Sequence, residues 1–212
     1  MIRTLAGVAM LSGLLVVLTY QWTLPRIMEN KRLAVQRAVF KVIPGITSHA
    51  AFRLDADGLT RVNEADATGT LVYAGYDEAG ALQGIAAEAA ARGYQDVIRI
   101  LYGYSPSCEC VTGITILQST ETPGLGDKIG TDPAFLANFK ALDARLNTGR
   151  TALQHAIVTV KHGKKTEPWQ IDAISGATIS SKAIGKMLND SAQTLLPRLD
   201  GRSDQLRIRT EP

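Results

Sequence analysis

The sequence predicts an α+β fold in which one N-terminal transmembrane helix precedes a single domain of antiparallel strands and helices. A charge-free apolar run occupies residues 4–25, and from about residue 50 paired strand-like segments are joined by short turns. A long amphipathic segment with helical spacing follows near the C-terminal end. Because no internal repeat or low-complexity linker divides the chain, its 212 residues are expected to form one anchor and one domain.

The apolar run has the length of a membrane span. Twenty helical residues extend roughly 30 Å, which matches the hydrocarbon core of a bilayer. Tyr20 and Trp22 lie at one end of the run, where aromatic rings favour the headgroup zone. A cleaved signal peptide has a shorter apolar core and a small-residue cleavage site, and this sequence shows neither. We therefore expect an uncleaved membrane anchor over residues 1–25.

Residues 26–45 are predicted to form a helical stalk that ends at Pro44 and Gly45. Apolar residues recur near helical spacing among basic ones, which is typical either of an amphipathic helix at the membrane surface or of a solvated continuation of the membrane helix. The positive-inside rule would place the body of the protein in the cytoplasm, because basic residues follow the span and only Arg3 precedes it.

One domain is expected over residues 46–200, followed by a tail over residues 201–212. Two hairpins are predicted, because strand-like runs flank the turn at 77–80 and the short connection at 105–109. The expected elements are strands at 70–76, 81–89, 96–104, 110–118 and 152–163, a polar helix-prone connector at 131–150, and a helix from residue 179.

Composition excludes some functional classes and leaves others open. A net charge of +3 without a basic run, and only 6% aromatic residues, argue against a nucleic-acid partner. The histidines show no metal-ligand spacing, and no catalytic triad is evident, so we assign neither metal ligands nor catalytic residues. In an extended strand Cys108 and Cys110 would be roughly 6.5–7 Å apart, which is the outer limit for a disulfide, and a turn could bring them closer. Three alternatives therefore stay open: a disulfide, two free thiols, or a role as iron–sulfur ligands.

The segment D-A-I-S-G-A-T-I-S-S at residues 172–181 is the first candidate site. Its small residues allow another group to approach the backbone, and Gly176 permits a tight turn. The segment opens a predicted helix, whose first amides lack internal partners and attract anions, phosphate above all. Thr178 would place its hydroxyl near those amides. The simpler alternative is that the segment is an ordinary helix N-cap.

The segment E-T-P-G-L-G-D-K-I at residues 121–129 is the second candidate. Pro123 and Gly124 are suited to the two central positions of a turn, and Gly126 allows a further unusual backbone angle. A stiff loop with little side-chain bulk can lie against a flat ring and present amides and the apolar Leu125 to it. A plain turn after a strand is the alternative.

Together, the two motifs behind one N-terminal span resemble the G subunit of the Rnf-type ion-translocating electron transport complex. The FMN-binding domain of that family also occurs in the C subunit of the sodium-pumping quinone reductase, and the resemblance includes Gly93 and Tyr94 at a strand entry. It implies that a periplasmic flavin transferase attaches FMN through its phosphate to Thr178. The other flavin-binding residues that it implies are Ser175, Gly176, Ala177, Thr122, Gly124, Leu125 and Gly126.

The resemblance implies an electron-carrier subunit of an ion-translocating oxidoreductase that has no turnover of its own. Its partners would be the other integral and peripheral subunits, the flavin transferase and membrane lipid. The chain would be a single-pass protein of the bacterial inner membrane with its FMN domain in the periplasm, against the charge rule. Many relatives carry a His-Lys pair where Ser119 and Thr120 stand, so a charged group beside the flavin is not expected at these positions.

Two alternative functions stay open at this stage. The chain could be a membrane-anchored stand-alone flavin reductase, for which the isolated domain would turn over substrate. It could also be a structural or assembly subunit that binds no flavin, in which the S-G-A-T segment is only a helix cap.

Overall fold

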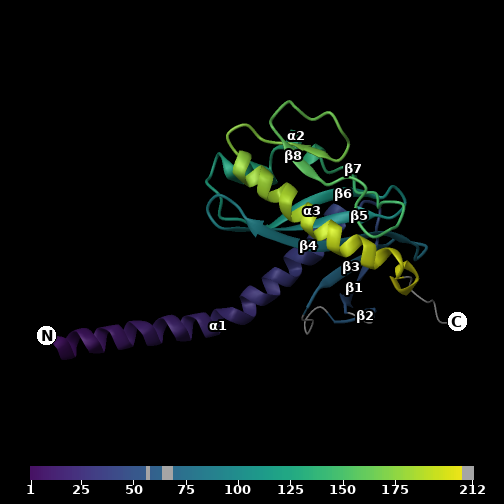
Figure 1. Ribbon diagram of the computed structural model, residues 1–212. Helices are drawn as coiled ribbons and strands as arrows, with labels where there is room; N and C mark the ends of the chain where they lie inside the picture. Colours follow the sequence, from purple (N-terminus) through teal and green to yellow (C-terminus); the bar gives the residue numbers. More distant parts are fainter. Residues whose placement is uncertain (56–57, 64–68, 207–212) are drawn as a thin grey trace.

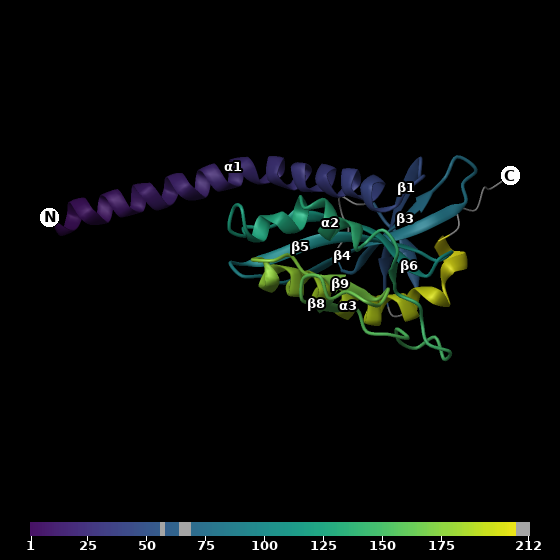
Figure 2. The same ribbon diagram turned by 90° about the horizontal axis from the view of Figure 1, so that it is seen from above.

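A long helix, α1 (Ile2–Val42), leads into a seven-stranded antiparallel sheet that is packed between helices on its two faces (Figures 1 and 2). The computed structural model describes residues 1–55, 58–63 and 69–206. The C-terminal end of α1 covers one face of the sheet, and the helix α3 (Thr178–Asp200) covers the other. The predicted α+β class is confirmed.

The first half of α1 is apolar and exposed, as a membrane span requires. By length and composition it is the one membrane-span candidate among the described residues. Pro25 lies inside the helix without ending it, and the basic residues after it continue the same helix. One uninterrupted helix therefore runs through both the predicted anchor and the predicted stalk. Only its last turns are buried, at Ala38, Val39 and Val42.

The sheet has the strand order β2-β1-β3-β4-β5-β6-β7, and all of its neighbouring pairs are antiparallel. The pairs β3–β4 and β5–β6 are the two predicted hairpins, which are confirmed. The strands are β1 (Ser48–Leu54), β2 (Leu59–Arg61), β3 (Leu71–Tyr76), β4 (Leu82–Arg92), β5 (Val97–Ser105), β6 (Cys110–Gln118) and β7 (Leu142–Asp143).

Side chains alternate between two cores along the central strands, as a pleated sheet dictates. Ala87 and Ile100 point into the larger core under α3, whereas Ala86 and Leu101 point into the smaller core under α1. Both faces are therefore apolar, and the sheet is buried between the two helices.

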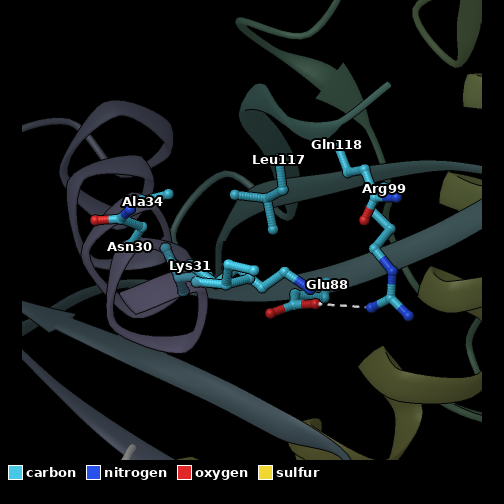
Figure 3. Close-up of a pocket in the computed structure, with 9 residues that line it drawn as sticks. Asn30, Lys31, Ala34, Glu88, Arg99, Leu117 and Gln118 are labelled. Atoms are coloured by element: carbon cyan, nitrogen blue, oxygen red, sulfur yellow. Dashed lines mark ion pairs between the residues drawn. The ribbon is translucent and has the colours of Figure 1, made fainter. Parts of the chain in front are cut away.

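Glycine permits the end of α1 to lie directly on the sheet. A Cβ on Gly103 would stand 2.1 Å from the carbonyl oxygen of Val42. The same carbonyl accepts a 2.5 Å hydrogen bond from the hydroxyl of Thr112. Farther toward its N-terminus the helix diverges from the sheet and leaves a groove of about 510 Å³ (Figure 3).

The connector between β6 and α3 departs most from the sequence prediction. Residues 131–150 form only a short helix, α2 (Pro133–Ala137), and the strand β7. The strand predicted at 152–163 is wrong except for β8 (Val158–Val160), which pairs in parallel with β9 (Gln170–Asp172). The reason is that α3 side chains replace strand partners: the amides of Leu153 and Ile157 donate to Gln193 and Asn189, both at 3.0 Å.

The helix predicted from residue 179 is α3, and its apolar side packs into the larger core. A 3₁₀ helix, η2 (Ser203–Leu206), follows it within the expected tail. Leu206 is buried, and its carbonyl accepts a 2.5 Å hydrogen bond from the hydroxyl of Tyr76. The rest of that expected tail, residues 207–212, lies outside the described residues.

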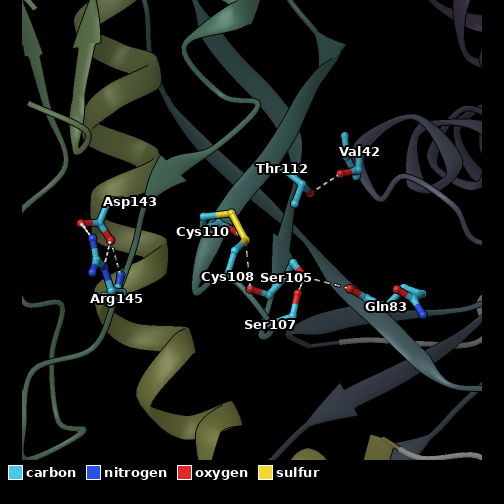
Figure 4. The surroundings of a disulfide bond; sticks show 9 residues. All are labelled: Val42, Gln83, Ser105, Ser107, Cys108, Cys110, Thr112, Asp143 and Arg145. Atoms are coloured by element: carbon cyan, nitrogen blue, oxygen red, sulfur yellow. Dashed lines mark hydrogen bonds and ion pairs between the residues drawn. A yellow bond between two sulfur atoms is a disulfide. The ribbon is translucent and has the colours of Figure 1, made fainter.

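Cys108 and Cys110 form a disulfide at the turn of the β5–β6 hairpin (Figure 4). Of the three alternatives left by the sequence, the structure shows this one. The connecting residue Glu109 has a positive φ of 49°, and the turn brings the two Cα atoms to 5.2 Å. An extended strand would have held them farther apart.

Candidate functional site

The two motifs meet at the start of α3, where they enclose a cavity of about 470 Å³. Small-molecule sites commonly have volumes of about 300–1,000 Å³. Segments far apart in the sequence contribute: the β4–β5 turn, the loop after β6, and the first turn of α3. The lining residues are Tyr94, Glu121, Thr122, Leu125, Gly126, Gly176, Ala177, Thr178, Ile179 and Ser180.

The helix α3 begins without a side-chain cap. Ala177 occupies the N-cap position, and Thr178 is the first helical residue. Within the described part of the chain, the hydroxyl of Thr178 and the amides of residues 178–180 have no assigned hydrogen-bond partner. The alternative that Thr178 serves as a helix cap is therefore not what the structure shows. These amides offer an anion site, and the Thr178 side chain is exposed beside them.

The loop before α3 is held in place by Ser181. Its hydroxyl donates to the carbonyl of Ala177 at 2.9 Å and accepts a hydrogen bond from the amide of Ile174 at 3.1 Å. Gly176 has a φ of +83°, a conformation that favours glycine. The backbone that presents Thr178 is thus fixed by a buried serine and by one glycine.

The loop after β6 forms the opposite wall. The amide of Leu125 donates to the carbonyl of Thr122 at 3.1 Å, which closes the turn predicted at Pro123 and Gly124. Gly124 has a φ of +77°, as the second central position of a type II turn requires. Leu125 Cδ2 lies 3.8 Å from the position of a Cβ built on Gly176, so the two loops are in contact. A 3₁₀ helix, η1 (Gly126–Gly130), then begins.

Glu121 joins the three segments that line the cavity. Its side chain is buried, and its carboxylate accepts hydrogen bonds from the hydroxyl of Ser180 and from the amide of Gln95, the latter at 3.0 Å. Burial raises the pKa of Glu121, but hydrogen bonds from Ser180 and from the amides of residues 94–96 outweigh it and hold the pKa below its usual value. Glu121 is therefore an ionised carboxylate fully occupied in holding the site together.

Two glycines make room for this carboxylate. A Cβ on Gly93 would stand 2.5 Å from Glu121 Oε1, and a Cβ on Gly126 would stand 2.7 Å from Oε2. Contacts this short do not occur between real side chains, so both positions require glycine as long as Glu121 occupies its place.

Six of the eight residues expected at the site line the cavity: Thr122, Leu125, Gly126, Gly176, Ala177 and Thr178. The other two lie outside the lining: Gly124 shapes the turn, and Ser175 borders a smaller cavity of about 240 Å³ behind the loop. Four further lining residues were not expected at the site from the sequence. Glu121, Ile179 and Ser180 belong to the two motifs, and Tyr94 belongs to the strand entry.

The rim of the cavity is apolar and exposed. Tyr94, Leu125 and Ile179 are 65%, 51% and 54% exposed, although large apolar side chains are usually buried in a soluble domain. Unpaired amides, an exposed hydroxyl, a small-residue loop and an apolar rim fit a ligand with a phosphate at one end and a flat ring at the other. FMN has both parts, and so the residues present fit that cofactor.

In comparison with known proteins, residues 93–193 match the family model described as FMN-binding domain. This stretch contains both motifs and all of the cavity-lining residues. The resemblance to the G subunits of ion-translocating oxidoreductases is also confirmed. The chain is 36% identical over 121 residues to the G subunit of the ion-translocating oxidoreductase complex of Methanosarcina acetivorans, a match that covers 57% of this chain and 56% of the relative.

A second relative is the G subunit of the Na(+)-translocating ferredoxin:NAD(+) oxidoreductase complex of Acetobacterium woodii, 38% identical over 101 residues. That match covers 48% of this chain and 43% of the relative, so the chain spans about half the length of the curated relatives it matches. The fold is similar to the crystal structure of Shewanella oneidensis NqrC, with a TM-score of 0.58, 20% identity, and coverage of 75% of this chain and 83% of that one.

Proposed function

We propose that this chain is a flavoprotein electron carrier that bears FMN as a phosphoester on Thr178 and works as a subunit of a membrane complex that couples electron transfer to ion translocation. One observation carries the proposal. The exposed hydroxyl of Thr178 lies beside unpaired helix amides, at the edge of a cavity that the 121–126 loop closes. The names of the relatives support the assignment to such a complex.

The protein's part in this function is to place and shield the cofactor. FMN supplies the redox chemistry when it is bound. The amides at the start of α3 would face the phosphate, and Gly176 and Leu125 would border the ring. Ser175, Gly124 and Ala177 would shape the loops around it. The exposed rim of Tyr94, Leu125 and Ile179 leaves the cavity accessible to an electron-transfer partner.

Attachment needs a balanced group transfer. The hydroxyl oxygen of Thr178 bonds to the phosphorus of FMN, and its proton passes to the departing nucleoside monophosphate. The phosphoanhydride bond of an activated donor, of the flavin-dinucleotide class, breaks as a nucleoside monophosphate leaves. We infer that a periplasmic flavin transferase performs this step, because Glu121, the one carboxylate among the cavity-lining residues, already accepts hydrogen bonds from Ser180 and from the amide of Gln95. Thr178 is then an attachment point and has no catalytic role.

The relation between the anchor and the site supports electron exchange at the membrane. The end of α1 packs at Gly103 and Thr112, and its earlier turns pass Arg99 and Leu117, nearer the cavity. The helix α3 accordingly begins at the end of the domain from which α1 departs (Figures 1 and 2). We propose that this end faces a membrane-embedded partner subunit, on the periplasmic side of the inner membrane.

The decisive experiment compares the wild type with Thr178→Ala and Thr178→Ser after expression with an active flavin transferase. We expect a mass increase of one FMN, and in-gel fluorescence that survives denaturation, for the wild type. Thr178→Ala should lose both signals, and Thr178→Ser, which keeps a hydroxyl, should retain at least part of them. A wild type without flavin in the presence of an active transferase would overturn the proposal.

Two further measurements address the circuit and the orientation. The purified domain loaded with flavin should show almost no turnover with soluble donors and acceptors, whereas a stand-alone reductase would turn over. Alkaline phosphatase fused after residue 212 should be active if the domain is periplasmic. An inactive, correctly expressed fusion would place the domain in the cytoplasm, as the charge rule indicates.

A further inference from the structure

The groove between α1 and the sheet is lined by different kinds of residues from those of the flavin cavity: it combines apolar and charged side chains. Its apolar surface comes from Ile27 and Val35 on the helix and from Leu117 on β6. The polar side chains around this surface are one carboxylate and four groups with hydrogen-bond donors: Glu88, Asn30, Lys31, Arg99 and Gln118. A binding site with an apolar floor and several donors at its edge suits an amphipathic ligand that carries an anionic group.

The donors of the groove come from both of its walls. Lys31 extends from α1 across the groove toward Glu88 of β4, and Arg99 of β5 lies on the far side of that carboxylate (Figure 3). The Arg99 guanidinium and the Glu88 carboxylate are 3.6 Å apart, with 53% and 35% of the side chains exposed. A solvent-exposed ion pair of this kind contributes little to stability, so a phosphate can compete with Glu88 for Arg99.

Position along the helix indicates where the ligand comes from. If the membrane span ends near residue 25, residues 27–35 lie about 3 to 15 Å beyond it at 1.5 Å per residue. The first turns of the groove are therefore level with lipid headgroups, which extend several ångströms beyond the hydrocarbon core. Residues 26–41 carry five basic residues and one acidic residue, Glu29, which pairs with Arg32 at 2.7 Å. Clusters of basic residues next to a membrane helix attract anionic lipid.

We propose that this groove binds the headgroup of one anionic phospholipid, with the phosphate between Lys31 and Arg99 and an acyl chain directed along Ile27 toward the bilayer. Asn30 and Gln118 would supply neutral hydrogen-bond donors. The site is separate from the flavin cavity, since the lining residues of the two do not overlap. The proposal does not depend on covalent flavin or on the side of the membrane that the domain occupies.

The test uses the full chain in detergent and native mass spectrometry, with phosphatidylglycerol and phosphatidylcholine of identical acyl chains as probes. We expect one phosphatidylglycerol per protein, bound at least tenfold more tightly than phosphatidylcholine. Lys31→Gln combined with Arg99→Gln should weaken phosphatidylglycerol binding at least tenfold. The control variant, Arg26→Gln combined with Arg37→Gln, also removes two positive charges, but from positions on α1 that do not line the groove. It should change phosphatidylglycerol binding less than twofold.

A steric variant separates the groove from its charge. Ala34 lines the groove and is exposed, so Ala34→Phe fills the space without changing any charge. We expect it to lower phosphatidylglycerol binding at least tenfold while the circular dichroism spectrum stays unchanged. Equal losses in the two double variants, equal binding of the two lipids, or full binding by folded Ala34→Phe would each overturn the proposal. So would a photocrosslinker at position 34 that captures a polypeptide in place of lipid in native membranes.

Discussion

The carboxylate of Glu121 accepts a hydrogen bond from the hydroxyl of Ser180, which lies 59 positions later in the sequence. The same carboxylate accepts the amide of Gln95, so one buried side chain connects the β4–β5 turn, the loop after β6 and the first turn of α3. These three segments are the ones that line the cavity. Glu121 therefore positions these three segments, because its carboxylate is engaged in hydrogen bonds to them.

Removal of Glu121 should therefore cost both stability and flavin incorporation. Glu121→Ala leaves the Ser180 hydroxyl and the Gln95 amide without a partner, and the cost of such unsatisfied groups is about 1–3 kcal/mol. Ser180→Ala removes one donor, but the Glu121 carboxylate keeps its hydrogen bonds from backbone amides. This variant should therefore lower the unfolding free energy by about 1 kcal/mol. Chemical denaturation measures both values, and flavin fluorescence in gels measures incorporation. An Ala variant as stable and as well flavinylated as the wild type would contradict this role.

The ionisation of Glu121 predicts a particular dependence of stability on pH. Its folded-state pKa lies below the usual value of 4.5, so the unfolded chain binds the proton more readily. The stabilisation is then complete above the usual pKa and is lost as the pH falls through the folded-state pKa. We expect the unfolding free energy of the wild type to drop between about pH 5 and pH 3, and that of Glu121→Gln to drop less steeply.

Asp190 provides the control for this pH profile. Its pKa is also lowered, by a hydrogen bond from Lys186 on the exposed side of α3. Because 54% of the Asp190 side chain is exposed, the pair is screened by water and salt. Asp190→Asn should leave the acid slope nearly unchanged. Equal slopes for the wild type and Glu121→Gln would show that Glu121 does not titrate with folding.

The two glycines of the 121–126 loop should differ in their response to alanine. At Gly126 a Cβ would stand 2.7 Å from Glu121 Oε2 and 2.9 Å from Ser180 Oγ, so Gly126→Ala displaces both groups. A misfit of this kind costs about 1–3 kcal/mol, and we expect flavin incorporation to fall with it. At Gly124 a Cβ meets open space but the φ of +77° is strained, so Gly124→Ala should cost about 1–2 kcal/mol and leave the cavity intact. Denaturation and in-gel fluorescence of the pair distinguish the two effects.

Local chemistry explains which parts of the fold the sequence could predict. The β3–β4 hairpin was predictable because its turn carries its own signal: the amides of Ala79 and Ala81 donate to the Asp77 side chain at 2.9 and 2.8 Å. The strand β7 was not predictable, because its two residues pair with Cys110 and Val111 some thirty positions earlier. The segment before β8 resembles a strand in its pattern, but Gln193 and Asn189 of α3 take its amides.

The residues of the candidate site also divide into those that the sequence indicates and those that only the folded structure reveals. Thr178, Gly176 and the turn at Gly124 stand out in the sequence, because each depends on neighbours within a few residues. The contribution of Glu121 depends on Ser180 and Gln95, which only the folded chain brings together. Glu121 lies within the predicted loop motif, but no residue near it in the sequence indicates these contacts.

The disulfide should matter for stability and not for the flavin site. Closing a loop of about three residues by a disulfide stabilises a fold by roughly 1–2 kcal/mol on the chain-entropy estimate. Cys108 and Cys110 lie at the turn of the β5–β6 hairpin, whereas the cavity borders the opposite ends of those strands. Replacing both cysteines by serine should lower the unfolding free energy by that amount while flavin incorporation stays unchanged. Loss of flavin in a folded double-serine variant would reveal a coupling that the contacts do not show.

The contact between α1 and the sheet gives the sharpest matched pair. A Cβ on Gly103 would stand 2.1 Å from the carbonyl oxygen of Val42, whereas a Cβ on Gly113 would stand 3.4 Å from the Val42 Cα, an ordinary contact. Gly103→Ala should therefore push the end of α1 off the sheet and cost about 1–3 kcal/mol or more. Gly113→Ala should be neutral or stabilising by up to about 1 kcal/mol, since alanine in a strand loses less backbone entropy than glycine.

Limited proteolysis at the α1–β1 junction, together with thermal melting, measures this difference. Cleavage near residues 43–47 should accelerate in Gly103→Ala and stay at the wild-type rate in Gly113→Ala. Because α1 is the only described link between the membrane and the domain, a detached helix end would also let the flavin cavity lose its fixed orientation to the bilayer. On the proposed function, Gly103→Ala should then slow electron transfer out of the flavin in membranes, even with full flavin incorporation. Equal proteolysis of the two variants would show that the helix end tolerates a side chain at Gly103.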